Sequence, residues 1–342
     1  MSRLISRREF LKLGSSALAL AALPPLPLPP DDLAARPESR FGRVTTYHAW
    51  VHGEPDPEAP HTGERRYDAI VNILDEVQGV GHYDVNPVWY QIVGGYIYSS
   101  WVQPVAYRLN RPMSVAQIEP PGLLAWVTVP YADARAHPDP SLERRYRLYY
   151  DAIFRVIDVQ IPDVRSGQVW YGLRDGLTWS GVNWVKAEHL RIVPAQEMTT
   201  LSPDVTNKRI LIELGKQWLT CFEGQDAVFD TRIASGMPGM LTPRGEHRVL
   251  RKMPTTRMTG GVGTGFYDLP GIGFVTYFTA KGVAVHGTYW HNDYGRRRSH
   301  GCVNVPTAAA QWVYRWTQPD VPYTESRLVA SKDDATYIEV TA

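Results

Sequence analysis

Short runs of hydrophobic residues, alternating with polar residues or following one another directly, recur along most of the chain. Segments such as 209–214 and 273–278 are rich in β-branched and aromatic residues, which is typical of β-strands. Residues 282–286 resemble a short buried strand that ends at His286. Pro306 follows a tight turn and begins a predicted helix that runs through Trp316, because proline is favoured in the first helical turn. The pattern therefore predicts a mainly β protein with one helix late in the chain.

Residues 40–195 contain an internal repeat, in which each copy has the length of a small β-barrel. Three short motifs recur in the same order in the two copies: Glu-Arg-Arg-Tyr at 64–67 and 143–146, Trp-Tyr at 89–90 and 170–171, and Trp-Val at 101–102 and 184–185.

The first copy also contains Gly-Gly-Tyr and Ser-Trp-Val, and with its Trp-Tyr motif it resembles bacterial SH3-like wall-associated domains. The second copy resembles them less closely. We therefore predict two SH3-like β-barrel modules, at residues 40–112 and 120–195. Their alternating aromatic residues are interpreted as barrel core, because alternation by itself predicts burial. A platform that binds glycan or peptide is the alternative.

Composition limits what the protein can be. The chain has 342 residues, of which 44% are hydrophobic, and a chain of this length usually forms more than one domain. Its formal net charge is only +1, so it lacks the basic surface that a nucleic-acid-binding protein needs. After a linker at 194–203, residues 206–342 form the third predicted unit, a β-rich catalytic domain whose core is separate from those of the two modules.

The N-terminus is predicted to direct export. The sequence Ser-Arg-Arg-Glu-Phe-Leu-Lys at residues 6–12 resembles the twin-arginine export motif, and an apolar run at 13–23 follows it. That run is too short to span the ~30 Å hydrocarbon core of a bilayer comfortably, which favours a signal segment over a permanent anchor. A proline-rich spacer at 24–30 comes next. We therefore predict an exported protein in the periplasm or on the outer face of the cytoplasmic membrane or cell wall, with the signal and spacer within residues 1–30.

Three residues near the C-terminal end suggest acyl-transfer chemistry. Cys302 becomes a useful nucleophile only as a thiolate, which requires a nearby base or cation. His286 precedes a loop that returns the chain to this cysteine, so it is the candidate base. Gly301 permits a sharp turn that can aim amide N–H groups at a developing oxyanion. Cys221, the second cysteine, lies in an apolar strand pattern and is predicted to be a core residue.

The same residues carry a family resemblance. A histidine followed by a loop and then Ser-His-Gly-Cys-x-Asn, here His286 and residues 299–304, resembles the motif of the L,D-transpeptidase (YkuD-type) family of peptidoglycan cross-linking enzymes. Residues 242–245, Thr-Pro-Arg-Gly, also match the Thr-Pro-x-Gly turn of that family. The resemblance covers the chain from about Asn207 to its C-terminus.

This resemblance implies an activity and an inhibitor class. Cys302 would attack the L,D peptide bond of a tetrapeptide stem, release D-alanine and form a thioester, with His286 as the general base and acid. An acceptor amine would then resolve the thioester into a cross-link. The family is acylated by carbapenems and needs no cofactor, so we expect Cys302 to react with carbapenems and expect neither a metal nor a cofactor.

Further site residues are assigned to supporting roles. His300 is expected to orient or support the thiol, and Ser299 and the carbonyl of Gly287 are alternative partners for the His286 imidazole. The amides of Gly301 and Cys302 are the expected oxyanion donors. Four other side chains are expected to shape the cleft or bind substrate: Trp290, Asn304, Tyr267 and Arg298.

Three alternatives stay open at this point. Water in place of the acceptor amine would make the enzyme an L,D-carboxypeptidase. A wall-binding protein with an inactive catalytic domain is the second alternative. In the third, His286, His291, His300 and Cys302 would hold zinc, although no CxxC or HExxH spacing is present.

Overall fold

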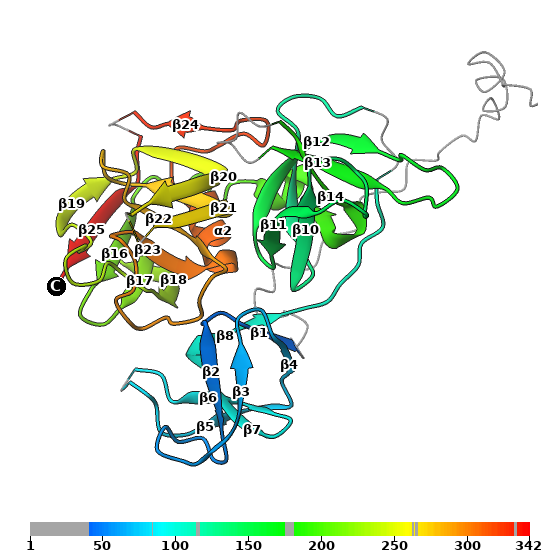
Figure 1. Cartoon of the computed structure of the whole chain (residues 1–342). Coiled ribbons are helices and arrows are strands. Elements are labelled where there is room, and N and C mark those ends of the chain that lie inside the picture. The colour runs from blue at the N-terminus through cyan, green and yellow to red at the C-terminus, as the bar shows by residue number, and fades with distance from the viewer. Residues whose placement is uncertain are drawn as a thin grey trace, which may run out of the picture. The chain divides into compact units, whose positions relative to one another are not determined.

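The computed structural model describes residues 41–342, apart from residues 84, 114–116, 175–180, 262, 264–265 and 332–333. The predicted export signal and proline-rich spacer lie outside the described residues, so both stay predictions. Within the described part, no helix combines the length and apolar character needed to cross a membrane. Most of the described secondary structure is β, and the one α-helix among the described residues lies late in the chain, as the sequence pattern predicts (Figure 1).

The first copy of the repeat forms two sheets, with strand orders β4-β1-β8 and β3-β2-β7-β6-β5. Its elements are β1 (Phe41–Val44), β2 (His48–His52), β3 (His61–Arg66), β4 (Ile70–Asn72), β5 (Asp75–Gln78), β6 (Val88–Ile92), β7 (Gly95–Tyr98), the 3₁₀ helix η1 (Ser99–Trp101) and β8 (Val102–Val105). We call this part module 1.

The second copy forms a single sheet with the order β11-β10-β14-β13-β12-β9-β15. Its elements are β9 (Leu123–Val127), β10 (Tyr131–Arg135), β11 (Arg144–Tyr149), β12 (Ile153–Gln160), β13 (Trp170–Arg174), β14 (Asn183–Lys186), the 3₁₀ helix η2 (Ala187–His189) and β15 (Leu190–Ile192). We call this part module 2.

The strand pairings confirm the repeat. In module 1, β1 pairs with β4 and β8, and β2 pairs with β3 and β7; in module 2, β9 pairs with β12 and β15, and β10 with β11 and β14. Asp68 and Asp151, which precede the repeated Ala-Ile, both adopt positive φ angles, 66° and 71°. The equivalence proposed for Trp-Val at 101–102 and 184–185 is wrong, because Trp101 lies in η1 whereas Trp184 lies in β14. The strand orders in both modules are those of open sheets, so the predicted closed barrels are not found among the described residues, and the identity of the modules as SH3-like stays a prediction.

The C-terminal part forms two five-stranded sheets, ordered β18-β17-β16-β25-β19 and β23-β22-β21-β20-β24. The predicted helix is confirmed as α2, which begins one residue after Pro306 and contacts β21, β22 and β23. The elements are the 3₁₀ helix η3 (Ala195–Met198), β16 (Lys208–Glu213), β17 (Trp218–Glu223), β18 (Asp226–Arg232), β19 (Gly245–Arg248), β20 (Arg251–Gly260), β21 (Tyr267–Tyr277), β22 (Ala284–Thr288), β23 (Val303–Pro306), α2 (Thr307–Trp316), β24 (Leu328–Val329) and β25 (Tyr337–Thr341).

Hydrophobic packing crosses the boundary predicted between residues 120–195 and 206–342. Leu124 and Ile153 of module 2 belong to the same buried cluster as residues of β16, β22 and α2. A second cluster joins module 2 to β21 and β22. Module 1, in contrast, has a buried cluster of its own. Of its alternating aromatic residues, Trp89, Tyr90 and Tyr98 are buried, as their interpretation as core predicts, whereas Tyr96 and Trp101 are only partly buried.

Candidate active site

One cleft of about 610 Å³ in the C-terminal part gathers the predicted site residues that have side chains. These residues come from the start of β21, from β22, from the loop after β22, from the turn that precedes β23 and from β23 itself. They are Tyr267, His286, Trp290, Arg298, Ser299, His300, Cys302 and Asn304.

Two adjacent strands bring the cysteine and the histidine to the same cleft. β22 and β23 run parallel, with His286 opposite Asn304 and Val285 opposite Val303. Cys302 is the residue immediately before β23. Parallel pairing requires a long crossover between the two strands, and the loop from Tyr289 to Ser299 provides it. The sequence separation of base and nucleophile therefore follows from the topology of the sheet.

The Cys302 thiol donates a long hydrogen bond to a backbone carbonyl. It is a free, partly exposed cysteine whose Sγ lies 3.8 Å from the carbonyl oxygen of Gly282. In the described structure this hydrogen bond goes to Gly282 rather than to the imidazole of His286. Burial raises the pKa of the Cys302 thiol to about 11, because the thiolate loses its hydration. Attack by the sulfur therefore requires that this hydrogen bond be broken and that a base take the proton.

The buried His286 imidazole is neutral and held in one tautomer. Its Nδ1 lies 3.0 Å from the carbonyl oxygen of Gly287, and only a protonated Nδ1 can donate to a carbonyl. The proton therefore resides on Nδ1, and Nε2 keeps the lone pair that a general base needs. Burial lowers the pKa of His286 to about 4. Of the two partners left open by the sequence, Gly287 makes this contact, whereas Ser299 does not.

Ser299 stabilises the turn that presents the cysteine. Its hydroxyl donates to the carbonyl oxygen of Cys302 and accepts a 3.1 Å hydrogen bond from the amide of Gly301. Gly301 has a φ of +115°, a conformation that favours glycine. The Gly301 amide, expected as an oxyanion donor, is thus engaged by Ser299 in this structure. The Cys302 amide remains the expected donor from the turn.

Thr242 is a site residue that the sequence analysis identified only as part of a turn. Its hydroxyl accepts a 3.0 Å hydrogen bond from the amide of Gly236 and donates a 2.8 Å hydrogen bond to the carbonyl of Gly301. These two contacts connect the Thr-Pro-Arg-Gly segment to the turn before Cys302. The Thr-Pro-x-Gly match was therefore the only sequence feature that pointed to Thr242. Its contact with Gly301 could be found only from the tertiary structure.

His300 and His291 each contact side chains other than Cys302. The ring of His300 lies against Tyr267, with centroids 4.9 Å apart. His291 is buried, with Nε2 lying 3.0 Å from the Asn304 side-chain amide and Nδ1 accepting from the amide of Asp293. Over the described residues, no group of three or more histidine, cysteine, aspartate or glutamate side chains converges to hold a metal ion. The zinc alternative therefore lacks an assembled ligand set there.

Charge in the cleft is strongly one-sided. Its described lining includes Arg251, Arg257, Lys281 and Arg298 but no aspartate or glutamate. Arg257 and Arg298 have carboxylate partners outside the lining, at Asp268 and Asp293. Arg251 instead lies over the ring of Tyr277, 3.9 Å from its centroid. This lining favours anionic ligands, since the cations face no carboxylate within the cleft.

Tyr267 can act as a hydrogen-bond donor near the sulfur. Burial, and secondarily the nearby Cys302, raise the pKa of the Tyr267 hydroxyl above its ordinary value. The hydroxyl therefore remains protonated across the neutral range, as an oxyanion donor must.

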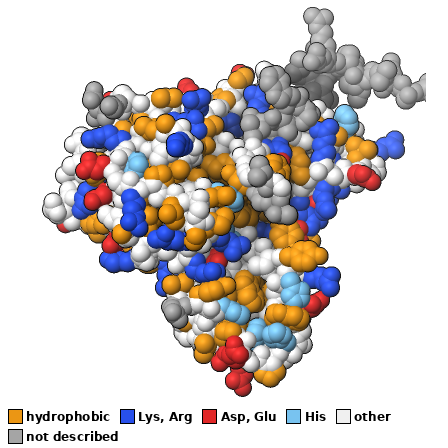
Figure 2. All heavy atoms as spheres, turned by 60° about the vertical axis from the view of Figure 1, so that its left-hand side comes forward, with side chains coloured by type: hydrophobic (Ala, Val, Ile, Leu, Met, Phe, Trp, Pro, Cys, Tyr) orange, Lys and Arg blue, Asp and Glu red, His pale blue; other side chains and the backbone are white. Residues whose placement is uncertain are grey.

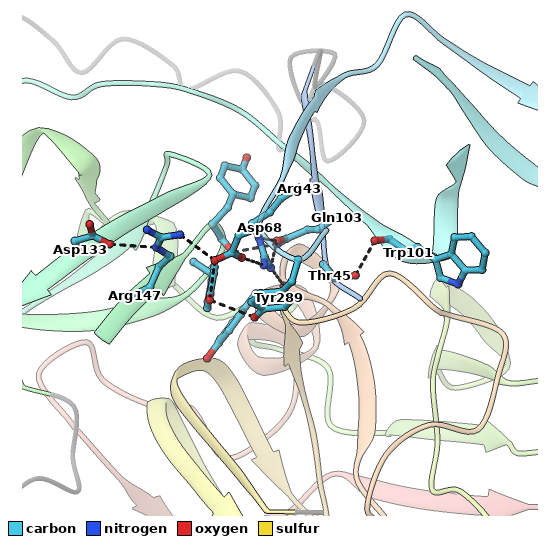
Figure 3. Close-up of polar contacts among 11 residues, drawn as sticks. Arg43, Thr45, Asp68, Trp101, Gln103, Asp133, Arg147 and Tyr289 are labelled. Carbon is cyan, nitrogen blue, oxygen red and sulfur yellow. Dashed lines mark hydrogen bonds and ion pairs between the residues drawn. The ribbon is translucent and has the colours of Figure 1, made fainter. Parts of the chain in front are cut away.

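Module 1 contacts the loop that forms one wall of the cleft. The fully buried Arg43 donates a 2.6 Å hydrogen bond to the carbonyl of Tyr289, while its other contacts go to Asp68 and Gln103 (Figure 3). Tyr289 directly precedes Trp290 of the cleft. Arg43 therefore fixes the backbone at the start of this wall.

Two further contacts fix the same loop farther along. The side chain of Asn292 donates to the carbonyl of Ser99, at 3.2 Å, and the guanidinium of Arg296 lies 3.3 Å from the ring centroid of Tyr83. Module 1 thus contacts both ends of the segment between Trp290 and Arg298.

Comparison with known proteins identifies the C-terminal part. Fold and cleft define a β-rich domain that presents a cysteine and a histidine from adjacent parallel strands. Residues 207–325 match the model of the YkuD family, described as the L,D-transpeptidase catalytic domain. Residues 207–325 are therefore similar to an L,D-transpeptidase catalytic domain, which confirms the resemblance carried by the Ser-His-Gly-Cys-x-Asn motif.

Similar solved structures carry the same description. They include a mutant L,D-transpeptidase from Enterococcus faecium (23% identity, 41% of this chain and 51% of that chain, TM-score 0.33). Others are an L,D-transpeptidase from Mycobacterium smegmatis (18%, 70% and 100%, 0.34) and L,D-transpeptidase 3 from Mycobacterium tuberculosis (15%, 56% and 92%, 0.33). The chain spans about half the length of the Enterococcus faecium structure. No curated protein matches the sequence.

Proposed function

We propose that this protein is a peptidoglycan L,D-transpeptidase that uses Cys302 as nucleophile and His286 as general base and acid. One observation carries the proposal: a free cysteine and a neutral histidine with an available Nε2 line one cleft, on adjacent strands of the segment that matches the family. The cationic lining supports a substrate with carboxylates, as the stem peptides of peptidoglycan have.

The resting pair is neutral, so proton transfer accompanies attack. The Cys302 sulfur turns from Gly282 toward the substrate, its proton passes to Nε2 of His286, and sulfur bonds to the carbonyl carbon of the third stem residue. The negative oxygen accepts hydrogen bonds from the Cys302 amide and the Tyr267 hydroxyl. The carbon–nitrogen bond then breaks, and His286 returns its proton to the departing D-alanine amine.

The second half-reaction reverses these roles. An acceptor amine attacks the thioester and gives a proton to His286, the carbon–sulfur bond breaks, and sulfur recovers a proton. Two half-reactions through one acyl-enzyme predict ping-pong kinetics. Water in place of the amine would give L,D-carboxypeptidase activity. Export through the twin-arginine-type segment would place the enzyme at the cell wall.

Intact-mass measurement with a carbapenem tests the proposal. We expect the full chain to gain the mass of one inhibitor. Cys302→Ala should abolish the adduct, whereas Cys221→Ala, the matched control at the second cysteine, should leave it unchanged. A β-lactam adduct is named for one similar structure, the Mycobacterium tuberculosis enzyme with a faropenem-derived adduct. Binding to isolated cell wall without any adduct would instead support the wall-binding alternative.

A separate measurement distinguishes the enzyme from the zinc alternative. The purified protein should contain no stoichiometric zinc and should keep its acylation rate after treatment with a chelator. About one equivalent of zinc, with loss of acylation on chelation, would contradict the cysteine–histidine mechanism.

A further inference from the structure

Module 2 contains a second cavity, far along the chain from the catalytic cysteine. Its volume is about 270 Å³, and its walls include the aromatic side chains of Tyr107, Tyr131 and Trp170. The strands that form it, β10, β14 and β13, are neighbours in the sheet (Figure 1). An adjoining cavity of about 190 Å³ shares Tyr107 and Tyr131 with it and has a mostly apolar lining.

Two buried polar atoms of this cavity's lining have no hydrogen-bond partner among the described residues. They are Nε of Arg135 and Nδ1 of His189. Buried polar atoms are nearly always satisfied, so an orphaned pair that lines one cavity requires an explanation. A ligand with complementary groups would supply the missing partners.

The charges of the lining favour an anionic group. Lys186 adds a second cation beside Arg135 and has only a 3.9 Å contact with Glu188. The one carboxylate of the lining, Asp133, already pairs with Arg147 at 3.1 Å (Figure 3). The excess charge that faces the cavity is therefore positive.

The orphaned atoms also specify a donor on the ligand. Nε2 of His189 lies 4.0 Å from the Glu188 carboxylate, beyond hydrogen-bond distance, so Nδ1 can accept or donate according to the tautomer. Nε of Arg135 is a donor. A ligand that satisfies both must present an acceptor to Arg135 and a hydrogen-bonding group to His189, which is an N–H or O–H when Nδ1 carries no proton.

The repeat provides an independent observation about this cavity. Strand register makes Arg135, Trp170 and Lys186 of module 2 equivalent to His52, Trp89 and Tyr98 of module 1. Arg135 pairs with Trp184 as His52 pairs with Tyr96. Trp170 pairs with Lys186 as Trp89 pairs with Tyr98. His189 ends η2 as Trp101 ends η1.

In module 1 these positions enclose a side chain of the protein itself. The ring of His82 lies 4.5 Å from Trp101, 4.8 Å from Tyr98, 5.5 Å from Trp89 and 5.9 Å from His52, measured between ring centroids. Figure 2 shows histidine side chains together with hydrophobic ones on the surface of this module. The loop equivalent to that of His82, residues 161–169, contributes no residue to the lining of the module 2 cavity. Module 2 therefore leaves open a site that module 1 fills with a planar, nitrogen-bearing ring.

We propose that the module 2 cavity binds the free carboxyl terminus of a short peptide. The carboxylate would accept from Arg135 and Lys186, and the preceding amide N–H would donate to His189. A small side chain would fit between Tyr131 and Trp170, and the rest of the peptide would follow the adjoining apolar cavity. This site is independent of acyl transfer at Cys302.

Calorimetric titration of the full chain with N-acetyl-alanyl-alanine tests the proposal, with both the D,D and the L,L forms. We expect one form to bind, and its C-terminal amide to bind at least about tenfold more weakly, because the charge-assisted hydrogen bonds are lost. Arg135→Gln should weaken binding by about tenfold or more. Lys186→Tyr, which introduces the residue of module 1, should fill the cavity and abolish binding.

Lys281→Gln is the matched control, because it removes a cation from the catalytic cleft instead. It should leave peptide affinity unchanged, and carbapenem acylation of Cys302 should remain normal in Arg135→Gln and Lys186→Tyr. Acylation also reports that these variants are folded. The proposal is overturned if neither dipeptide binds, if acid and amide bind equally, or if only Lys281→Gln weakens binding. Binding of a wall glycan fragment in place of both peptides would overturn it as well.

Discussion

The rate of Cys302 alkylation should keep rising with pH from neutrality to at least pH 10. The thiol is buried against the Gly282 carbonyl, and its pKa is raised to about 11. The His286 imidazole, with its pKa lowered to about 4, carries no positive charge that could stabilise a thiolate at pH 7. At that pH only about one thiol in 10⁴ is ionised, since the pH lies about four units below the pKa. The rate should therefore rise about tenfold per pH unit between 7 and 10.

The assay is the rate of iodoacetamide addition, followed by intact mass between pH 6.5 and 10. Cys221→Ala protein isolates the signal from Cys302, and circular dichroism at each pH checks that the fold persists. His286→Ala should keep the same slope, because the imidazole is neutral over the whole range. A plateau below pH 8 that disappears in His286→Ala would refute this reasoning, since it would reveal a thiolate–imidazolium pair at rest.

Three further outcomes follow from buried charge and shared packing. The pKa of His286 is about 4 in the folded protein and about 6.5 when the imidazole is exposed. Between these two pH values the unfolded chain therefore binds more protons than the folded one. Urea titrations should show that the free energy of unfolding falls by up to about 3 kcal/mol from pH 6.5 to pH 4. An unchanged value would contradict the burial of a neutral imidazole. Arg43→Met should lower the free energy of unfolding by about 3–5 kcal/mol in denaturant titrations, because it removes one member of a buried polar cluster. It should also slow carbapenem acylation, because the Tyr289 carbonyl loses its hydrogen-bond donor. A wild-type acylation rate would show that this contact does not influence the site. A fragment of residues 206–342 should be insoluble, whereas a fragment of residues 113–342 should unfold cooperatively. The reason is that module 2 shares hydrophobic clusters with the catalytic domain. A stable 206–342 fragment would show that those clusters are dispensable.

Local pattern identified much of this protein before any coordinates. Strand-like alternation predicted a mainly β chain, and Pro306 marked the start of the one α-helix in the described part of the chain, because backbone preferences act over a few residues. The repeated motifs predicted two similar modules, and the strand pairings bear this out. The loop between His286 and Cys302 indicated that both residues belong to one site, since a returning loop can bring a base to a nucleophile.

Contacts between distant segments were decided by the tertiary structure alone. The sequence left open whether Ser299 or Gly287 orients His286, and it assigned the Gly301 amide to the oxyanion; the fold instead places Gly287 on His286, and Ser299 on Gly301.

Shared cores are a further property of the fold. The linker at 194–203 suggested separate units, yet side chains of module 2 pack with those of the catalytic domain. The apparent misalignment of Trp101 with Trp184 has the same origin, since matching letters do not reveal which strand pairs with which.

Protonation shows most clearly what sequence could not decide. The order of residues showed that a thiol and an imidazole belong to one site, because a motif records which groups are present. The charge of each group depends on how much of its hydration is lost on burial and on which carbonyl oxygen it faces. Only the folded chain removes water from both groups, which raises the pKa of the thiol and lowers the pKa of the imidazole.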